Sequence, residues 1–247
     1  MNIAGSSATD VSCRLWMVGW SLMSVGIAGL GTAQLLFAAA LPDLVLIDLS
    51  RQAARLSGLL LAGCGIAMLA KRHSLAAATT ASILATFAAI AFFASANGKP
   101  ASLTTWVPLA ELLTFAVAAL SGVRGHASGR PLRACLGSAL LLFGAIHLQF
   151  HDAIASMIPQ WIPWAGALPF ATGVIQLAAG LAILLGRGTR TAGTGVGLLF
   201  LSWLPLVHAP RLIGNPFDNG EWSFALIALA LAGCALMAGA NRRLPDA

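Results

Sequence analysis

The chain has 247 residues, of which 58% are hydrophobic and only 9% are charged. An ordinary soluble domain has about a quarter of its residues charged, so this composition excludes a large soluble domain and predicts a membrane protein. The formal net charge of +6 comes from short loops and not from a basic stripe with interleaved aromatic residues, so we expect no nucleic-acid partner. The four cysteines form no Cys-x-x-Cys pair, the usual mark of a thiol-disulfide enzyme or a cysteine zinc site.

Eight apolar runs are long enough to cross a bilayer, because a hydrocarbon core about 30 Å thick needs about 20 residues of helix. The expected spans are residues 15–40, 53–70, 75–96, 103–121, 132–151, 168–185, 191–209 and 222–240. These runs lack the alternation of barrel strands, so we expect an all-α integral membrane protein with about eight transmembrane helices. The first run has a second interpretation, as a cleaved signal peptide that ends at the small residues 38–40.

The loops between these spans differ in their content of Lys and Arg. Four basic residues lie on one side, namely Arg51, Arg55, Lys99 and Arg211, and the other ten lie on the side of both termini. Since basic loops are retained in the cytoplasm, we expect both termini to be cytoplasmic.

Internal repetition divides the chain into two tandem units, residues 1–125 and 126–247. Three residues recur at the same spacing, since Gly58, Gly65 and Arg72 correspond to Gly173, Gly180 and Arg187, 115 positions later. The segment 31–37 likewise matches 144–150, so that Gln34 corresponds to His147. An even number of helices in each unit predicts parallel repeats, and not the inverted repeats of many transporters.

Three motifs of the second unit point to a known family. They are Gly144-Ala-Ile-His147; Met157-Ile-Pro159-Gln-Trp161-Ile-Pro163-Trp164; and Thr172-Gly173-Val-Ile-Gln176 followed by Gly180 and Arg187. In these motifs the chain resembles the DoxX-like family of four-helix bacterial membrane proteins. The later run His208-Ala-Pro210-Arg211, followed by Glu221-Trp222, is similar to a variant found in duplicated members of that family.

The resemblance implies two tandem four-helix DoxX-like bundles in a bacterial inner membrane. The first unit is similar only as a degenerate repeat, because it lacks the Val-Pro-x-Trp-Leu-Pro-like segment. A related protein, the membrane subunit of thiosulfate:quinone oxidoreductase, makes a redox role the main functional lead that the resemblance offers.

Ionisable side chains gather at the expected outer ends of the helices in the second unit. They are His147, His151, Asp152, His208, Arg211, Asp218 and Glu221. His147 and His151 are four residues apart, which places them on one helix face with the spacing of a two-histidine metal pair. We predict a site that binds a polar headgroup or a quinone carbonyl, or that exchanges protons, with His147, His151 and His208 as candidate metal ligands. A purely structural role is the alternative, because histidines near helix ends often hydrogen-bond to headgroups or carbonyls.

Glu111 is the one acidic residue that falls inside a predicted span. A carboxylate at that depth is costly, so we expect Glu111 to be protonated, paired or facing a polar cavity, with Asn97 and Gln176 as candidate neighbours. Two roles are open for Glu111. It takes part in proton exchange or ligand binding, or it forms a hydrogen bond between helices.

Trp161 and Trp164 belong to a proline-containing segment that is too short to cross the bilayer and too apolar for an ordinary loop. We expect this segment at the outer interface. There it forms either a lid over the histidine site or, with Trp106 and Trp222, part of an aromatic belt.

Together these features favour a redox-associated membrane subunit that holds a quinone or similar lipophilic molecule near its outer face. Beyond the lipid bilayer, the expected partners are a redox protein or a second copy of the chain. No catalytic, nucleotide, haem or iron-sulfur motif is present, so direct electron transfer requires an external partner. Two alternatives stay open. One is a proton-coupled transporter or permeability factor for a small solute, with Glu111 as the coupled group, and the other is a structural subunit that binds a partner protein.

Overall fold

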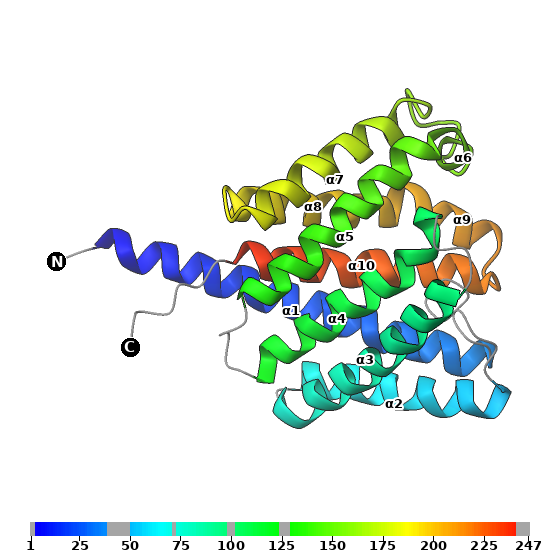
Figure 1. Ribbon diagram of the computed structural model, residues 1–247, viewed down its shortest axis with the longest axis horizontal. Coiled ribbons are helices and arrows are strands. Elements are labelled where there is room, and N and C mark those ends of the chain that lie inside the picture. The colour runs from blue at the N-terminus through cyan, green and yellow to red at the C-terminus, as the bar shows by residue number, and fades with distance from the viewer. Residues whose placement is uncertain (1–2, 39–49, 71–72, 98–101, 124–128, 241–247) are drawn as a thin grey trace.

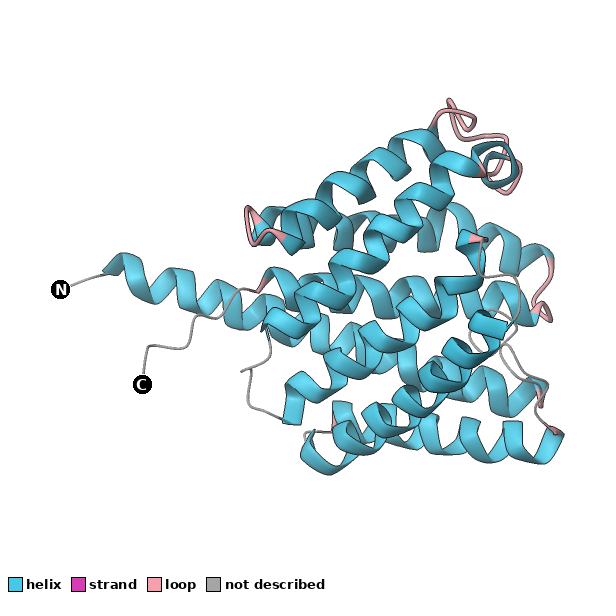
Figure 2. Cartoon of the chain, in the orientation of Figure 1, coloured by secondary structure: helices cyan, strands magenta, loops and turns pink. Residues whose placement is uncertain are grey.

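The computed structural model describes residues 3–38, 50–70, 73–97, 102–123 and 129–240. Every regular element in these ranges is helical, as the composition predicts (Figures 1 and 2). The helices are α1 (Ile3–Phe37), α2 (Arg51–Leu69), α3 (His73–Asn97), η1 (Leu103–Trp106), α4 (Val107–Val123), α5 (Gly129–Gln149), α6 (His151–Ala155), α7 (Leu168–Leu184), α8 (Thr189–Trp203), η2 (Leu204–His208), α9 (Ala209–Gly214) and α10 (Asn219–Gly239).

Seven helical stretches in the described residues are long and apolar enough to cross a bilayer. The remaining expected span, residues 168–185, corresponds to α7, whose 17 residues extend over about 26 Å, slightly less than a hydrocarbon core of about 30 Å. The described chain is therefore an all-helical protein with several helices suited to a membrane. The count of eight crossings stays a prediction.

The first helix begins earlier than the sequence predicts. α1 starts at Ile3 instead of residue 15, and its N-terminal part projects beyond the other helices (Figure 1). On this part, Arg14 Nη2 lies 3.0 Å from Asp10 Oδ2, one helical turn away, so the two charges that interrupt the apolar run support each other. The expected cleavage site at 38–40 extends into residues 39 and 40, which lie outside the described ranges.

Eight long helices pack as a closed ring that follows the order of the chain. Each of α1, α2, α3, α4, α5, α7, α8 and α10 contacts the next, and α10 packs extensively against α1 to close the ring. The contacts repeat between halves, because α1 packs on α2 as α5 packs on α7, and α3 packs on α4 as α8 packs on α10. Two halves of the chain related by a two-fold rotation would give this pattern of contacts. The division at residue 125 itself stays a prediction.

Glycines at matching positions allow close helix contacts in each half. A Cβ atom on Gly58 would lie 2.7 Å from the carbonyl oxygen of Gly31, and one on Gly173 would lie 3.0 Å from the carbonyl oxygen of Gly144. Both distances are too short for a side chain, so α1 with α2 and α5 with α7 meet backbone to backbone. This packing holds the first and second helices of each half at one register.

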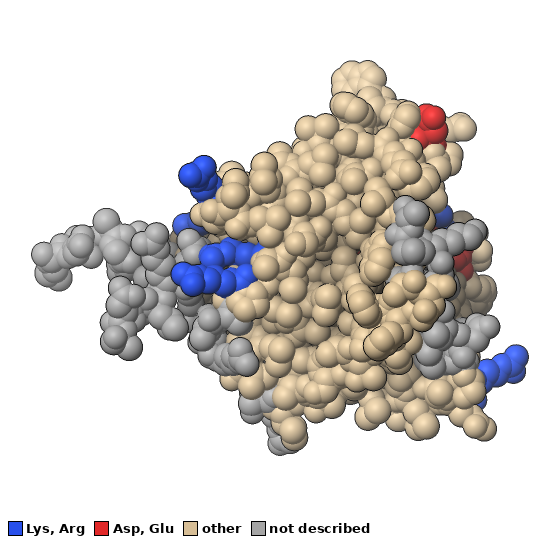
Figure 3. Space-filling view, in the orientation of Figure 1, with Lys and Arg blue, Asp and Glu red and all other residues tan. Residues whose placement is uncertain are grey.

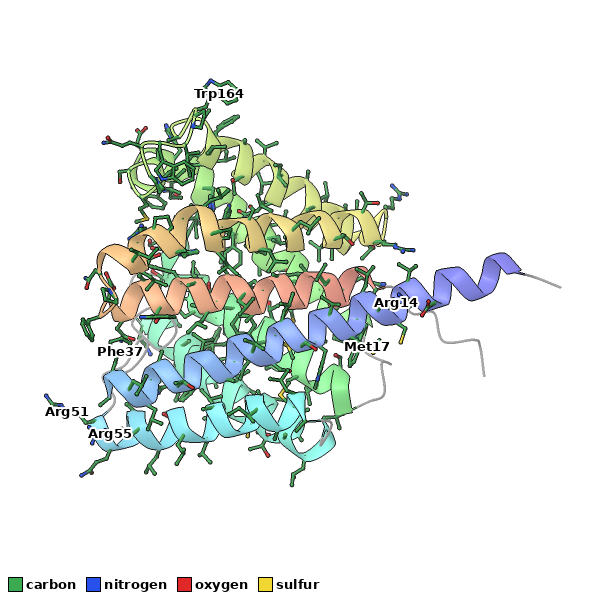
Figure 4. All side chains as sticks on the ribbon, turned by 180° about the vertical axis from the view of Figure 1, so that it is seen from behind. Arg14, Met17, Phe37, Arg51, Arg55 and Trp164 are labelled. Carbon is green, nitrogen blue, oxygen red and sulfur yellow. The ribbon has the colours of Figure 1, made fainter. Side chains whose placement is uncertain are left out.

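Charged side chains separate between the two ends of the helices. In Figure 3, Lys and Arg gather beside the chain termini, whereas acidic side chains lie at the opposite end. Figure 4 shows Arg51 and Arg55 at that opposite end, far from Arg14. Among the described residues, one end of the helices is therefore richer in Lys and Arg, and the other end carries Asp152, Asp218 and Glu221.

Candidate functional site

A cavity of about 380 Å³ lies among the helices at the end opposite the chain termini. Its walls come from the last turns of α5 and α8, the start of α4, the first halves of α7 and α10, and the helical turns of η2 and α9. Most of the lining is aliphatic or aromatic, as in Phe143, Ile146, Leu199 and Phe200. A small number of polar side chains interrupts this apolar wall, which is the usual character of a site for a small organic ligand.

The cavity extends far into the helix ring. On α10 its lining runs from Glu221, in the first turn, to Leu231. At 1.5 Å per residue this is a depth of about 15 Å, or roughly half the length of the helix. On α7 it reaches Gln176, near the midpoint of that helix. A bound molecule would therefore lie largely inside the apolar part of the protein.

Glu221 is the centre of a polar cluster at the shallow end of the cavity. Its Oε1 atom forms a hydrogen bond of 2.7 Å with Nδ1 of His208, and its Oε2 atom forms an ion pair with Arg211, 2.8 Å from Nε. The carboxylate is almost completely buried, while Arg211 is about one-third exposed. Asp218 caps α10 by accepting a 3.0 Å hydrogen bond from the backbone N–H of Glu221. These contacts fix the carboxylate at the positive end of the helix dipole.

A π-helical turn brings His208 to this cluster. The turn η2 covers Leu204–His208 and contains Pro205, which lacks a backbone N–H and cannot continue a regular α-helix without a clash. The wider turn keeps the chain helical through α8, η2 and α9, and turns of this kind are frequent at functional sites. It places Leu206, Val207 and His208 together in the cavity wall.

His147 forms a second polar point of the wall. Its Nδ1 atom lies 2.9 Å from the carbonyl oxygen of Phe143. Since a carbonyl oxygen only accepts, Nδ1 carries the proton and Nε2 of the neutral ring is left as an acceptor. The imidazole stacks on Trp203, with ring centroids 5.6 Å apart and planes inclined by 23°. This contact joins α5 to α8 and fixes the orientation of the ring.

In the first half, the residues that correspond to His147 and Thr172 form a hydrogen bond with each other. Gln34 occupies the position of His147, and Ser57 occupies that of Thr172. Nε2 of Gln34 donates to Oγ of Ser57 over 2.8 Å. In the second half, by contrast, His147 and Thr172 both line the cavity. The two halves thus use equivalent positions differently, one for a contact between helices and the other for a cavity wall.

Glu111 and Gln176 line the same cavity, although they come from different predicted units. Glu111 lies on α4 and is 6% exposed, and Gln176 lies on α7 and is fully buried. Asn97 instead donates to the carbonyl oxygen of Phe93 on its own helix and is not part of the wall. Of the two candidate neighbours of Glu111, the structure therefore places only Gln176 at the site.

His151 and Asp152 lie outside the cavity wall. α5 ends at Gln149, and Phe150 has the non-helical angles φ −113° and ψ 30°, so His151 begins the separate helix α6. The expectation that His147 and His151 share one helix face assumed an unbroken helix at this point. His151 Nε2 lies 3.1 Å from Oδ1 of Asp152 in a pair whose carboxylate is 95% exposed. Neither residue of this pair lines the cavity.

Trp161 and Trp164 point outward while their segment covers the cavity. Their side chains are 64% and 84% exposed, and Figure 4 shows Trp164 extending from the edge of the molecule. The cavity is lined instead by aliphatic side chains from the same region, including Met157, Ile158 and Ile162. The segment thus acts as a cover through its aliphatic residues, and the exposed tryptophans have the position expected of an aromatic belt.

The described residues contain no group of three or more His, Cys, Asp or Glu side chains that is placed to hold a metal ion. Of the three candidate histidines, His147 and His208 line the cavity and His151 does not. Trp203, by contrast, is a wall residue that the sequence analysis did not select. Its position two residues before a proline inside a predicted span is the signal that could have found it.

Residues 136–211 match a family model described as a domain of unknown function (DUF8561). This segment runs from α5 to α9 and includes His147, Gln176 and His208, whereas Glu111 and Glu221 lie outside it. No curated protein and no solved structure matches the chain.

Proposed function

We propose that the protein is a multi-pass membrane subunit that holds a quinone-like lipophilic molecule in the cavity between α4, α5, α7, α8 and α10. The observation that carries this proposal is the cavity itself, which is apolar over most of its wall, reaches about 15 Å along α10 and is interrupted by a few fixed polar groups. A molecule with an apolar body and one or two oxygen atoms matches this distribution.

The polar groups of the site have separate tasks in this proposal. The ring of Trp203, stacked on His147, offers an aromatic surface for a flat ligand ring. The His147 imidazole and the His208–Glu221–Arg211 cluster supply hydrogen bonds and a place for protons beside the ligand oxygens. An external redox protein would supply or remove electrons, since the sequence has no haem or iron-sulfur motif.

We further propose a DoxX-like relationship and a bacterial inner-membrane location. The relationship rests on the motifs between Gly144 and Arg187, most of which line or cover the cavity. Cytoplasmic termini are supported by the concentration of Lys and Arg at the end of the helices where the chain begins and ends (Figure 3). The cavity then opens toward the outer side of the membrane.

Quenching of tryptophan fluorescence by a decyl-substituted benzoquinone tests the ligand. In detergent micelles, we expect saturable quenching of the wild-type protein, because the quinone ring would contact Trp203. Trp203→Phe should lose most of the saturable component, whereas the control Trp164→Phe, which alters an exposed side chain, should keep it. Quenching that rises linearly and equally in all three proteins would contradict the proposal.

A second candidate function, proton-coupled transport of a small solute, is favoured by the position of Glu111. Its buried carboxyl group lines a cavity that also contains the Glu221 cluster, so acidic groups lie at two depths of one space. In liposomes with an imposed pH gradient, this function predicts faster decay of the gradient with wild-type protein than with Glu111→Gln. Equal decay rates, with Asp152→Asn as the control, would remove this candidate.

A further inference from the structure

Gln176 is the one fully buried amide that faces the cavity among the described residues. It lies near the middle of α7, and neither its Nε2 nor its Oε1 atom has a hydrogen-bond partner in the described structure. A buried amide without partners is costly, and the cost is greater between apolar helices than near water. A side chain of this kind is expected where a ligand supplies the missing hydrogen bonds.

The fold of the repeat does not require a polar side chain at the position of Gln176. Residue Leu61 occupies the equivalent place in the first half, 115 positions earlier, and is a buried core residue. An aliphatic side chain therefore suits this position of the second helix in the repeat. Gln176 replaces it in the half that contains the cavity, which links the amide to the cavity and not to helix packing.

Several other polar groups of the wall already have protein partners. Oε1 of Glu221 contacts His208, Oε2 forms an ion pair with Arg211, and the Ser202 hydroxyl donates to the carbonyl oxygen of Leu199. The His147 ring uses Nδ1 for its backbone contact, which leaves Nε2 as an acceptor. Among the groups of the wall, Gln176 therefore offers a donor, Nε2, and an acceptor, Oε1, and His147 offers the acceptor Nε2.

This set of groups selects for a ligand that donates as well as accepts. A ketone, an ether or an oxidised quinone has only acceptor oxygens, so it would satisfy the amide N–H and leave Oε1 of Gln176 unpaired. A hydroxyl group accepts a hydrogen bond from the amide N–H and can also donate one through its own O–H to Oε1. Resting on the proposed lipophilic ligand, we infer that Gln176 recognises a hydroxyl group at the inner end of that ligand. Within the quinone class, the site favours the reduced quinol.

The decisive comparison uses a decyl-substituted phenol and its methyl ether, which differ only in the hydroxyl proton and its replacement by a methyl group. Affinities are measured by native mass spectrometry of the purified full-length protein in detergent. The wild-type protein should bind the phenol about tenfold more tightly than the ether. Gln176→Leu should remove this preference. Gln34→Leu, the same substitution at a hydrogen-bonded amide of the first half, should retain it.

Each outcome separates the inference from the function on which it rests. Equal binding of phenol and ether to the wild-type protein overturns the inference and leaves the lipophilic ligand in place. A preference that persists in Gln176→Leu shows that another group reads the hydroxyl, and also overturns it. Binding of neither compound overturns both the inference and the proposed function. The wild-type comparison needs no variant, so the inference is tested even if Gln176→Leu does not fold.

Discussion

Nδ1 of His208 lies 2.7 Å from Oε1 of Glu221, across the loop between α9 and α10. The contact joins a π-helical turn to the first turn of the most buried helix, and Arg211 completes it from the other oxygen. This cluster lies at the shallow end of a cavity whose wall is mostly apolar. The position of η2 and α9 relative to α10 therefore depends on one buried carboxylate.

Replacing that carboxylate should destabilise the protein. Glu221→Gln removes the negative charge that Arg211 pairs with. It also places an amide oxygen or nitrogen, instead of a carboxylate oxygen, beside His208. We expect a loss of about 1 to 3 kcal/mol in the free energy of unfolding, less than for a fully buried pair because Arg211 is partly in contact with solvent. Thermal unfolding in detergent measures the effect, and Asp152→Asn, in an exposed pair, is the control. Equal midpoints for the two variants would contradict the structural role.

The two histidines of the H-x-x-x-H pair should differ in their effect on ligand binding. His147 lines the cavity and His151 does not, so His147→Ala should weaken binding of the decyl-benzoquinone about tenfold while His151→Ala leaves it unchanged. Saturable tryptophan quenching gives both affinities. A similar loss in both variants would indicate that the site extends outward over α6.

Gln176→Leu should stabilise the ligand-free protein. The change removes a buried amide whose two polar atoms lack partners and keeps a side chain of comparable size. A gain of about 1 to 3 kcal/mol is expected in the free energy of unfolding, seen as a higher thermal midpoint in detergent after ligand removal. A lower midpoint would show that the amide contributes to folding, and so oppose its assignment to a ligand.

The glycine contact between α5 and α7 should not tolerate a methyl group. In Gly173→Ala, the new Cβ atom would lie 3.0 Å from the Gly144 carbonyl oxygen, forcing the helices apart at a cost of about 1 to 3 kcal/mol. Gly195→Ala is the matched control, because no atom lies within 4 Å of its added Cβ and helix propensity favours alanine. Thermal midpoints of the two variants should move in opposite directions, and a shared direction would refute the packing argument.

Helices were predictable here because long apolar runs between charges leave few alternatives in a membrane. The ends of the helices were less predictable. In α1, for example, the Arg14–Asp10 pair interrupts the apolar run, but the helix continues through it. His151 was assigned to the wrong face because the break at Phe150 has no proline or glycine to signal it. Local pattern fixes the helix type, while single residues decide where one helix stops.

The candidate site was predictable only in part. His147, His208, Arg211 and Glu221 share one helix end, and loop order alone places them at a common depth. Convergence of Glu111 with this group depends on the contact between α4 and α5, which joins the two halves and has no trace in the local sequence. Only the tertiary arrangement shows that the acid from the first half and the histidines from the second face one space.

Native mass spectrometry of the protein, gently solubilised from its own membranes, shows whether the cavity holds a ligand. We expect a bound lipophilic molecule with the mass of a quinone or quinol, and its loss in Ala228→Phe, which fills the cavity at a wall residue. Circular dichroism would confirm that this variant keeps its helices. A wild-type chain that carries no such molecule, or a bound molecule that Ala228→Phe retains in full, would contradict a ligand in this cavity.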